Sequence, residues 1–353
     1  MTKAHPPAFT IDGRAIGAGY PPYIIAELSG NHNGDIGRAF ALIEAAAAAG
    51  ADAVKLQTYT ADTITIDHNG PEFVVDLPLW RGRTLHDLYR EAHTPWDWHA
   101  ALFDKARACG ISLFSSPFDF TAVDFLEDLN CPAYKIASFE MVDTQLIAKA
   151  ASTGKPMIIS TGMASLEEIA QAIQAAREGG CRDLAILHCV SAYPAPYSDA
   201  FLANITDLKN RFDVHVGLSD HTPGITVPIA AATLGAVIIE KHVTLSRDDG
   251  GVDSQFSLEP DELRSLVDAA AIVPDLLGGP FYGVKESERD SVKYRRSLYV
   301  VADIRKGEPF TPDNVRSIRP GLGMAPSALP RILNKHAARD IGAGTPLTPE
   351  DIE

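Results

Sequence analysis

Short apolar runs rich in β-branched residues alternate along most of the chain with longer, alanine-rich segments of helical length. A run that is apolar at nearly every position is typical of a strand buried on both faces, and its alternation with helices predicts βα units and a parallel sheet. The predicted strands are residues 23–29, 53–58, 112–117, 133–138, 156–161, 184–190, 215–220 and 236–243. Eight such units within about 250 residues predict a TIM (β/α)8 barrel.

The segments between these runs carry the signals that begin and end helices. Residues 36–49 are rich in alanine, which has high helix propensity, and Gly50 follows where a helix commonly ends. Ser165 and Glu168 form a capping-box pattern, which predicts a helix that runs to residue 177. Similar segments follow most of the other runs, as the barrel interpretation requires.

Residues 62–95, which we call the excursion, do not fit this alternation. They are too long for a plain βα loop and contain several aromatic residues. Long loops of this kind are usually functional. We therefore expect the excursion to form a lid or to face the substrate.

The composition changes after Gly278, Gly279 and Pro280, first to a charged linker and then to a short β-rich tail. Within the tail, residues 303–313 match residues 340–350 at the Asp, Ile, Gly, Pro and Thr-Pro positions, which predicts a strand, a Gly turn and a helix start that occur twice. We divide the chain into a barrel domain (1–280), a linker (281–295) and a tail domain (296–353). A unit this small has a small core, so we expect it to dock against the barrel or another subunit.

Composition narrows the class of protein. Hydrophobic residues make up 46% and charged residues 22%, near the average for globular proteins, and no apolar stretch approaches the roughly 20 residues of a membrane helix. The net charge of −15 disfavours binding to nucleic acid or to an anionic membrane. The first seven residues lack the pattern of a secretory signal, so we expect a cytoplasmic protein. The four cysteines have no CxxC spacing, which favours reduced thiols over zinc sites or disulfides.

Two histidines stand at the ends of the last two predicted strands, each beside an acidic residue. His221 follows Asp220, and His242 lies two residues after Glu240. A single histidine at a strand end is more often a hydrogen-bonded structural residue than a ligand. In a barrel, however, the carboxyl ends of neighbouring strands meet at one mouth. The pair therefore predicts one divalent metal site.

Polar side chains interrupt or follow most of the other strands near the same end. They are Glu27, Lys55, Gln57, Ser115, Ser116, Lys135, Ser138, Glu140, Ser160 and Thr161. Lys55 and Lys135 interrupt apolar runs, and a buried ammonium needs a partner. An ion pair with Glu27 or Glu140 and an anion-binding role are both open. Two lysines with several hydroxyls and backbone amides suit phosphate and carboxylate, which predicts a small polyanionic ligand.

A lysine that forms a Schiff base with a carbonyl substrate is the competing interpretation. The histidine pair argues against it, because a metal would already polarise the carbonyl that a Schiff base would activate. Borohydride trapping and inactivation by EDTA distinguish these two mechanisms.

Several segments together resemble the sialic acid synthase family, whose members condense phosphoenolpyruvate with an amino-sugar aldehyde. The resemblance runs essentially end to end and is carried by residues 25–27, 31–34, 50–58, 134–138, 160–163, 187–189, 217–222 and 240–242. The tail, with Arg319, Pro320 and Gly321 between its repeats, is similar to the antifreeze-like or SAF domain of that family. Leu28, Ser29, Ser191 and residues 251–257 resemble the pseudaminic acid synthase branch.

The resemblance implies a metal-dependent condensation of phosphoenolpyruvate with 2,4-diacetamido-2,4,6-trideoxy-L-altrose and water, giving pseudaminic acid and phosphate. Residues expected to hold phosphoenolpyruvate are Lys55, Lys135, Ser138, Ser160, Ser219 and one or both of Ser115 and Ser116, and Thr161 and Ser191 complete the substrate-binding set. Glu27, Gln57, Glu140, Tyr193 and Asp253 would face the reacting carbons and the sugar. His221 and His242 would bind Mn, Mg or Co. Glu27, Lys55, Lys135, Glu140 and Asp253 form the expected catalytic group.

The resemblance also implies a domain-swapped homodimer, in which Arg319 enters the active site of the partner subunit and contacts the sugar. From the sequence alone, Arg319 would be read as a solvated surface residue. The alternatives are an N-acetylneuraminate or legionaminate synthase, a metal-dependent aldolase that does not use phosphoenolpyruvate, and a carbohydrate-binding protein. Release of phosphate from phosphoenolpyruvate separates the synthases from the other two.

Overall fold

Parallel strands close into a barrel in the computed structural model, which describes residues 6–76 and 80–353. The barrel strands are β3 (Tyr23–Glu27), β4 (Ala53–Thr58), β5 (Ser112–Pro117), β6 (Tyr134–Ile136), β7 (Met157–Ser160), β8 (Leu184–Cys189), β9 (His215–Asp220) and β10 (Ile238–His242). Each pairs in parallel with the next along the chain, and β10 pairs with β3 to complete the circle. The predicted TIM barrel is confirmed.

Five of these strands, β3, β6, β7, β8 and β10, are shorter than the predicted runs. After Glu27, for example, the backbone turns at Ser29, whose φ of 45° is incompatible with a strand. The apolar pattern continues beyond the last ladder hydrogen bond because these residues still pack in the interior. Their polar ends therefore belong to the loops at the carboxyl mouth of the barrel.

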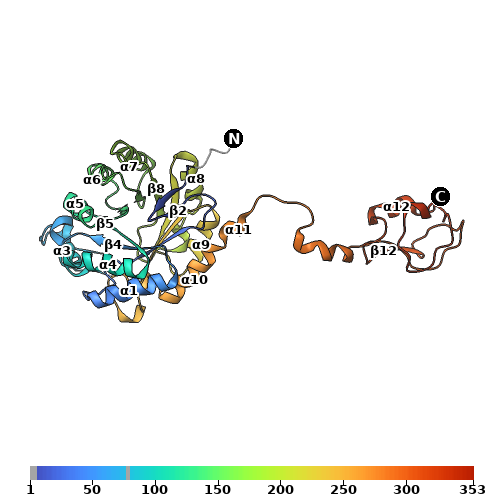
Figure 1. The fold of residues 1–353 in the computed structure, drawn as a ribbon, viewed down its shortest axis with the longest axis horizontal. Coiled ribbons are helices and arrows are strands. Elements are labelled where there is room, and N and C mark those ends of the chain that lie inside the picture. Colours follow the sequence, from blue (N-terminus) through green and yellow to red (C-terminus); the bar gives the residue numbers. More distant parts are fainter. Residues whose placement is uncertain (1–5, 77–79) are drawn as a thin grey trace. The chain divides into compact units, whose positions relative to one another are not determined.

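A layer of helices surrounds the strands (Figure 1). It consists of α1 (Ile36–Ala49), α4 (His99–Cys109), α5 (Phe120–Asp128), α6 (Thr144–Ala151), α7 (Leu166–Glu178), α8 (Ala203–Arg211), α9 (Thr226–Thr233) and α10 (Pro260–Ala271), and α11 (Val273–Leu277) follows the last of them. Helix α1 ends as predicted at Gly50, with φ of 86°. Ser165 and Glu168 form the predicted capping box at the start of α7.

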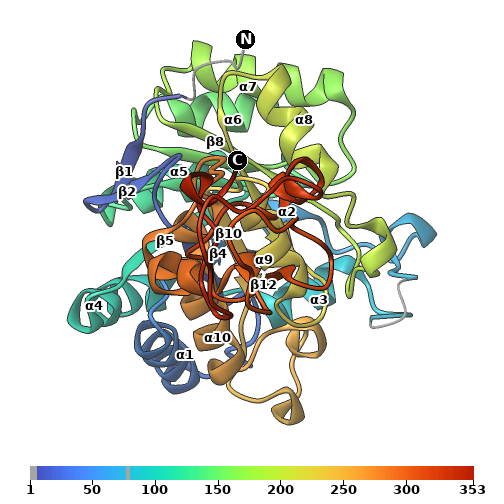
Figure 2. The same cartoon turned by 90° about the vertical axis from the view of Figure 1, so that its right-hand side faces the viewer.

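The N-terminal hairpin, β1 (Phe9–Ile11) and β2 (Arg14–Ile16), was not predicted. Figure 2 shows it outside the barrel, in dark blue. The ring of Phe9 lies 5.2 Å from that of His215, the first residue of β9, so the hairpin covers the amino end of the barrel. Its Asp-Gly turn, at positions 12 and 13 with positive φ at both, is a strong hairpin signal that the sequence offered. The hairpin therefore does not cover the carboxyl end of the barrel, where a TIM barrel carries its active site.

The excursion contains three short helices at this carboxyl end: α2 (Ala61–Ile64), the 3-10 turn η1 (Pro71–Phe73) and α3 (Leu85–Ala92). Residues 77–79 of the excursion lie outside the described part, as do residues 1–5, which belong to the segment where no secretory signal is expected. Further 3-10 turns, η2 (Trp96–Trp98), η3 (Tyr197–Asp199), η4 (Arg247–Asp249) and η5 (Ser254–Phe256), lie in the other loops. Among the described residues, no helix is both long enough and apolar enough to span a membrane.

The chain divides into two units, Met1–Gly278 and Gly279–Glu353. The second begins with the 3-10 helix η6 (Glu286–Tyr294) and contains β11 (Ser297–Val300) and β12 (Val315–Ile318), an antiparallel pair. Three short helical segments complete it: η7 (Pro326–Ala328), α12 (Leu329–Ile332) and η8 (Pro349–Asp351). Its separate core is formed by Leu298, Val300, Ile304, Phe310, Val315, Ile332, Ala337, Ile341 and Leu347.

The internal repeat of the tail pairs with itself. Ile304 and Ile341 exchange both backbone hydrogen bonds, at 2.9 and 2.8 Å. The carboxylate of Asp303 accepts a bond from the amide of Ala343, and that of Asp340 accepts one from Lys306, both at 2.7 Å. The predicted strands reduce to isolated bridges, of which Ile304–Ile341 joins the two copies, and only the second Thr-Pro-acid segment starts a helical turn, η8. The two copies satisfy each other's backbone groups, so neither needs a longer strand.

Candidate active site

A cavity of about 430 Å³ lies at the carboxyl ends of the barrel strands. Its polar lining comes from the strand ends and the loops after them. These residues are Glu27, Ser29, Lys55, Gln57, Lys135, Ser138, Glu140, Ser160, Cys189, Tyr193, Ser219, His221, Glu240, His242 and Asp253. The structure thus brings most of the predicted site residues to one place. Apolar side chains, many of them from the excursion, form the rest of the wall.

Lys55 is held inside the barrel by carboxylates on both sides of it. Its Nζ lies 2.7 Å from Glu27 Oε2 and 3.9 Å from Glu240 Oε1, and it donates a hydrogen bond to Ser116 Oγ at 3.2 Å. Glu27 is itself fixed, because Ser29 and Gln57 donate to its Oε1 at 2.7 and 2.9 Å. The predicted ion pair between Lys55 and Glu27 is therefore present.

Lys135 has a different partner from those predicted. Its Nζ lies 3.3 Å from Glu240 Oε1, and Ser219 Oγ donates to the same oxygen at 3.1 Å. Glu240 thus joins the two lysines; the sequence pattern indicated it only as the acidic neighbour of His242, and its place between the lysines was not predicted. A signal was available, because Glu240 and His242 are two residues apart on one strand and so face the same side.

Burial and these contacts shift the pKa values of the cluster. Burial lowers the pKa of Lys55, but the carboxylates of Glu240 and Glu27 outweigh it, and the net shift is upward. For Lys135, burial outweighs Glu240, and the nearby Lys55 lowers its pKa further. Burial also raises the pKa of Glu240, yet the two lysines bring it below its ordinary value. The pKa of each lysine therefore depends on the negative charge of the carboxylates beside it.

Several buried polar atoms in this cavity have no hydrogen-bond partner among the described residues. They are Ser160 Oγ, Glu140 Oε2, Glu240 Oε2 and His242 Nδ1. Buried polar groups of folded proteins are nearly always satisfied, by protein, water or ligand. Their grouping around two lysines indicates that the cavity is built to receive a polar ligand.

The two predicted metal ligands lie side by side, with ring centroids 5.2 Å apart. His221 Nδ1 is 2.8 Å from the carbonyl oxygen of Val190, which can only accept, so the neutral ring keeps its lone pair on Nε2. His242 Nδ1 is buried without a partner in the described part of the chain. Two free imidazole nitrogens fit a divalent ion whose other ligands are substrate and water oxygens. The described residues form no group of three or more His, Cys, Asp or Glu able to hold a metal unaided.

Two carboxyl groups in the cavity lining, those of Glu140 and Asp253, are half-buried. Burial raises the pKa of Glu140 to about 7, although Lys135 and Lys55 oppose that shift. Burial and the nearby Glu27 raise the pKa of Asp253 to about 6. Such groups can exchange protons near neutral pH, as acid–base catalysis requires.

Other predicted site residues lie apart from the cavity lining. Ser115 Oγ bonds Thr58 Oγ1 at 2.6 Å, and Thr58 contacts His99 of α4, so Ser115 faces the helices and lies outside the expected anion site. Only one of two consecutive strand residues can face inward, and Ser116 is the one that meets Lys55. Thr161 Oγ1 donates a hydrogen bond to the carbonyl oxygen of Leu187 at 3.1 Å, so its buried hydroxyl is already satisfied by the backbone.

Ser191 and Arg319 were also predicted to bind substrate. Ser191 Oγ lies 3.8 Å from Cys189 Sγ, just behind the cavity lining. Arg319 belongs to the second unit, directly after β12.

Models of two known families match this chain. The NeuB family model covers residues 42–281, and the SAF domain model covers residues 295–353. The chain belongs to the NeuB family. The family and the tail domain expected from the sequence are both confirmed.

Curated relatives of this NeuB-family chain cover nearly its whole length. It is 44% identical to the pseudaminic acid synthase of Helicobacter pylori, across 94% of this chain and 98% of that protein. It is 42% identical to the pseudaminic acid synthase of Campylobacter jejuni serotype O:23/36, across 93% and 96%. An N,N'-diacetyllegionaminic acid synthase of Campylobacter jejuni is 35% identical, across 90% and 96%.

A solved structure of a related synthetase supports the same fold. The N-acetylneuraminic acid (sialic acid) synthetase from Leptospira borgpetersenii, in complex with citrate, superposes with a TM-score of 0.73 at 31% identity, across 82% of this chain and 96% of that one. The spore coat polysaccharide biosynthesis protein SpsE of Bacillus subtilis follows with a TM-score of 0.67 at 34% identity, across 98% and 99%.

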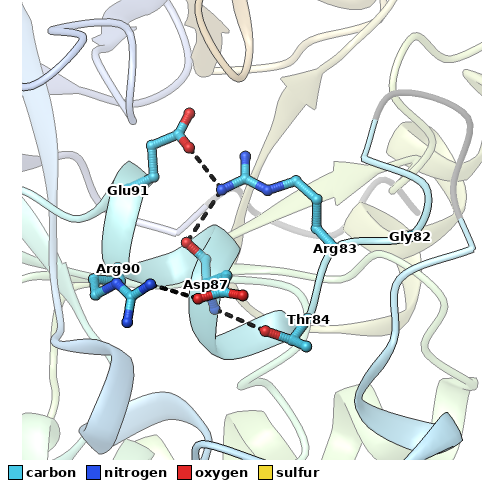
Figure 3. Close-up of a pocket in the computed structure, with 6 residues that line it drawn as sticks. All are labelled: Gly82, Arg83, Thr84, Asp87, Arg90 and Glu91. Carbon is cyan, nitrogen blue, oxygen red and sulfur yellow. Dashed lines mark hydrogen bonds and ion pairs between the residues drawn. The ribbon is translucent and has the colours of Figure 1, made fainter. Parts of the chain in front are cut away.

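A second hollow, over the outer face of α3, does not have the features of an active site (Figure 3). Arg83 donates to Glu91 at 2.6 Å, and Arg90 donates to Asp87 at 2.5 Å. The charges of this hollow therefore satisfy one another at the surface, and exposed pairs of this kind contribute little energy. The candidate active site is therefore the cavity inside the barrel mouth.

Proposed function

We propose that the chain is a pseudaminic acid synthase, which condenses phosphoenolpyruvate with 2,4-diacetamido-2,4,6-trideoxy-L-altrose and water to give pseudaminic acid and phosphate. The observation that carries the proposal is the pair of buried lysines, Lys55 and Lys135, joined by Glu240 beside two free histidine nitrogens. Relatives named for this activity at 42–44% identity support the choice of sugar.

Phosphoenolpyruvate is placed at the lysine end of the cavity. Lys55 and Lys135 attract its phosphate and carboxylate, and Ser138 and Ser160 offer hydroxyl groups to the anionic oxygens, while Ser219 supports the site through its bond to Glu240. The hydroxyl of Ser160 has no partner within the described chain, so it is free to donate. Fixed positive charges in a buried site also stabilise the charge that builds up on phosphate as it leaves.

The sugar aldehyde is placed toward His221 and His242, which would hold the divalent metal. When bound there, Mn, Mg or Co supplies Lewis acidity to a carbonyl oxygen. Gln57 donates to both Glu27 and Ser29 at 2.9 Å and so fixes the carboxylate that faces the reacting carbons. Tyr193 packs its ring 4.4 Å from that of His221 and limits the space at the aldehyde.

Two σ bonds form in the reaction, one carbon–carbon bond and one bond from C2 to the oxygen of water, and the bond from C2 to the phosphate oxygen breaks. The C3 carbon of phosphoenolpyruvate bonds to the aldehyde carbon, whose oxygen takes up a proton. Water adds to C2 and loses one proton, which leaves a hydroxyl on C2. That hydroxyl loses its proton, which the departing phosphate can accept, as the C2–O bond to phosphate breaks and leaves a ketone. Glu27 is placed to move the proton of the water, and Glu140 and Asp253 can be protonated near neutral pH.

The test is phosphate release from phosphoenolpyruvate with three sugars in parallel: the trideoxy diacetamido altrose, N-acetylmannosamine and the legionaminate precursor. We expect release that depends on added Mn²⁺ and is fastest with the first sugar. Faster release with another sugar would reassign the branch. No release with any of them would leave the aldolase and carbohydrate-binding alternatives.

We also propose that two chains form a swapped homodimer in which Arg319 serves the partner's cavity, and that the reaction takes place in the cytoplasm. Mixing two inactive variants tests the swap. In a mixed dimer of R319A and K135M, the intact barrel of the first receives the intact tail of the second, and activity returns. If each tail serves its own barrel, mixing restores nothing.

A further inference from the structure

Helix α3 of the excursion presents two chemically distinct faces. Leu85, Leu88, Tyr89 and Ala92 line the cavity, at spacings of three, four and seven residues that place them on one side of a helix. The opposite side carries the charged residues drawn in Figure 3. Thr84 caps the helix by accepting a bond from the amide of Asp87 at 3.1 Å. The helix is therefore oriented with its apolar stripe toward the substrate.

Other apolar residues extend this stripe into a wall. Ile64, Val75, Phe118 and Val252 line the same cavity. The ring of Tyr59 lies edge-on to those of Tyr89 and Phe118, at 5.7 and 5.0 Å, which fixes the aromatic part of the wall. Val75 and Leu88 are 8% and 7% exposed, so a group that meets them is removed from water.

The cavity thus joins a charged end, formed by the barrel strands, to an apolar end, formed largely by the excursion. Under the proposed function, the aldehyde must reach the charged end, where the lysines and histidines lie. The carbons of the sugar farthest from the aldehyde then meet the apolar wall. Where the terminal carbon meets Val75 and Leu88, whose side chains have no hydrogen-bonding atom, a hydroxyl would be buried without a partner, whereas a methyl group would be buried favourably.

We propose that the wall formed by Val75, Leu88 and their neighbours selects amino sugars whose terminal carbon, the one farthest from the aldehyde, is a methyl group and not a hydroxymethyl group. This inference rests on the proposed function for the direction in which the sugar lies. It assigns the choice of sugar to the excursion and separates that choice from the lysines and histidines of the reaction.

The test compares the 6-deoxy sugar, 2,4-diacetamido-2,4,6-trideoxy-L-altrose, with the analogue that carries a hydroxyl at C6. An apolar pocket discriminates against an added hydroxyl by up to about 100-fold in kcat/KM, and we expect the wild type to prefer the 6-deoxy sugar by about 10- to 100-fold. V75T, which is close in shape, and L88Q should each reduce this ratio at least about fivefold. The change should appear in KM for the sugar and leave KM for phosphoenolpyruvate as it is.

The matched control is I66T, which makes a similar polar substitution at an exposed position of the same excursion, where Ile66 is 58% exposed. It should leave the ratio unchanged. An unchanged ratio in both V75T and L88Q, with phosphate release intact, would overturn the inference.

Direct calorimetry with the two sugars keeps the inference separate from the reaction. If the wild type releases no phosphate but binds the 6-deoxy sugar more tightly, and V75T removes that preference, the wall is supported and the proposed reaction fails. Equal affinity for the two sugars in the wild type overturns the wall, whatever the reaction.

Discussion

Lys241 Nζ lies 2.7 Å from Asp220 Oδ2, and both side chains are buried in the wall of the barrel. Each of the two residues directly precedes a histidine of the candidate metal site. Because side chains alternate along a strand, this pair lies behind the histidines, on the side facing the helices. Asp220 also accepts bonds from the amide and hydroxyl of Thr222, at 3.1 and 3.0 Å, and so fixes the backbone on both sides of His221.

Breaking this pair should weaken metal binding as well as stability. D220N and K241M each leave a buried group without its partner, and we expect each to lower the free energy of unfolding by about 3 kcal/mol. The double variant should recover part of that loss, though not all, because Thr222 still loses its carboxylate. Urea unfolding measures stability, and electron paramagnetic resonance measures the affinity for Mn²⁺. Unchanged Mn²⁺ affinity in both single variants would show that the pair has no positioning role.

Glu240 balances the charge of two buried ammonium groups. Removing its charge should make the stability of the protein depend on added anions. We expect E240Q to be destabilised by about 3 kcal/mol, because Lys135 and Lys55 lose the carboxylate they share. Added phosphate should raise the melting temperature of E240Q more than that of the wild type, since it can replace the missing charge. The surface carboxylate of Glu44, which pairs with Lys105, provides the control variant E44Q. An equal response to phosphate in all three proteins would argue against an anion site at the lysines.

Glu140 should make stability fall as pH rises. Burial raises its pKa from 4.5 to about 7, so between these values the folded state binds a proton that the unfolded state has released. The stability contributed by the protonated form is present below about pH 4.5 and is lost as pH rises through 7, by about 3 kcal/mol in all. E140Q cannot ionise, so the wild type should lose stability relative to it between pH 5 and 8. Urea unfolding at these two pH values measures the difference, with E167Q on the surface of α7 as control. Parallel curves for wild type and E140Q would contradict the shift.

The barrel could be predicted from the sequence because every strand is buried on both faces and therefore forms a continuous apolar run. The limits of the strands could not, because apolar residues such as Leu28 stay in the core after the ladder has ended. The hairpin before β3 was missed although its Asp-Gly turn marks it. Its strands are only three residues long and form no run.

Those residues of the candidate site that lie at strand ends could be predicted from the sequence, because the strand ends and the alternation of side chains along a strand determine their positions. Neighbouring residues of a strand face opposite sides, so this alternation could have shown that Ser115 and Ser116 do not both face inward. Residues two apart face the same side, so it could also have placed Glu240 in the site with His242. The partner of Lys135 was not predictable, because it lies on a strand far away in the sequence and its pairing depends on how the barrel closes. The apolar wall has a helical spacing within α3, but which face of that helix meets the cavity is decided by tertiary packing.

The lysines of this site should act as fixed charges and not as Schiff-base nucleophiles. A Schiff base needs a neutral amine, and the pKa of Lys55 is raised by Glu240 and Glu27, which outweigh burial. Burial lowers the pKa of Lys135, which makes it the better candidate, yet its Nζ is paired with Glu240 at 3.3 Å. We therefore expect borohydride, added with substrates present, to leave the mass of the chain unchanged, whereas EDTA abolishes phosphate release and Mn²⁺ restores it. H221A and H242A should lose Mn²⁺ binding, while H215Q, at the opposite end of β9, should keep it. A reduced adduct on the peptide that carries Lys135, together with full activity in EDTA, would establish aldolase chemistry instead.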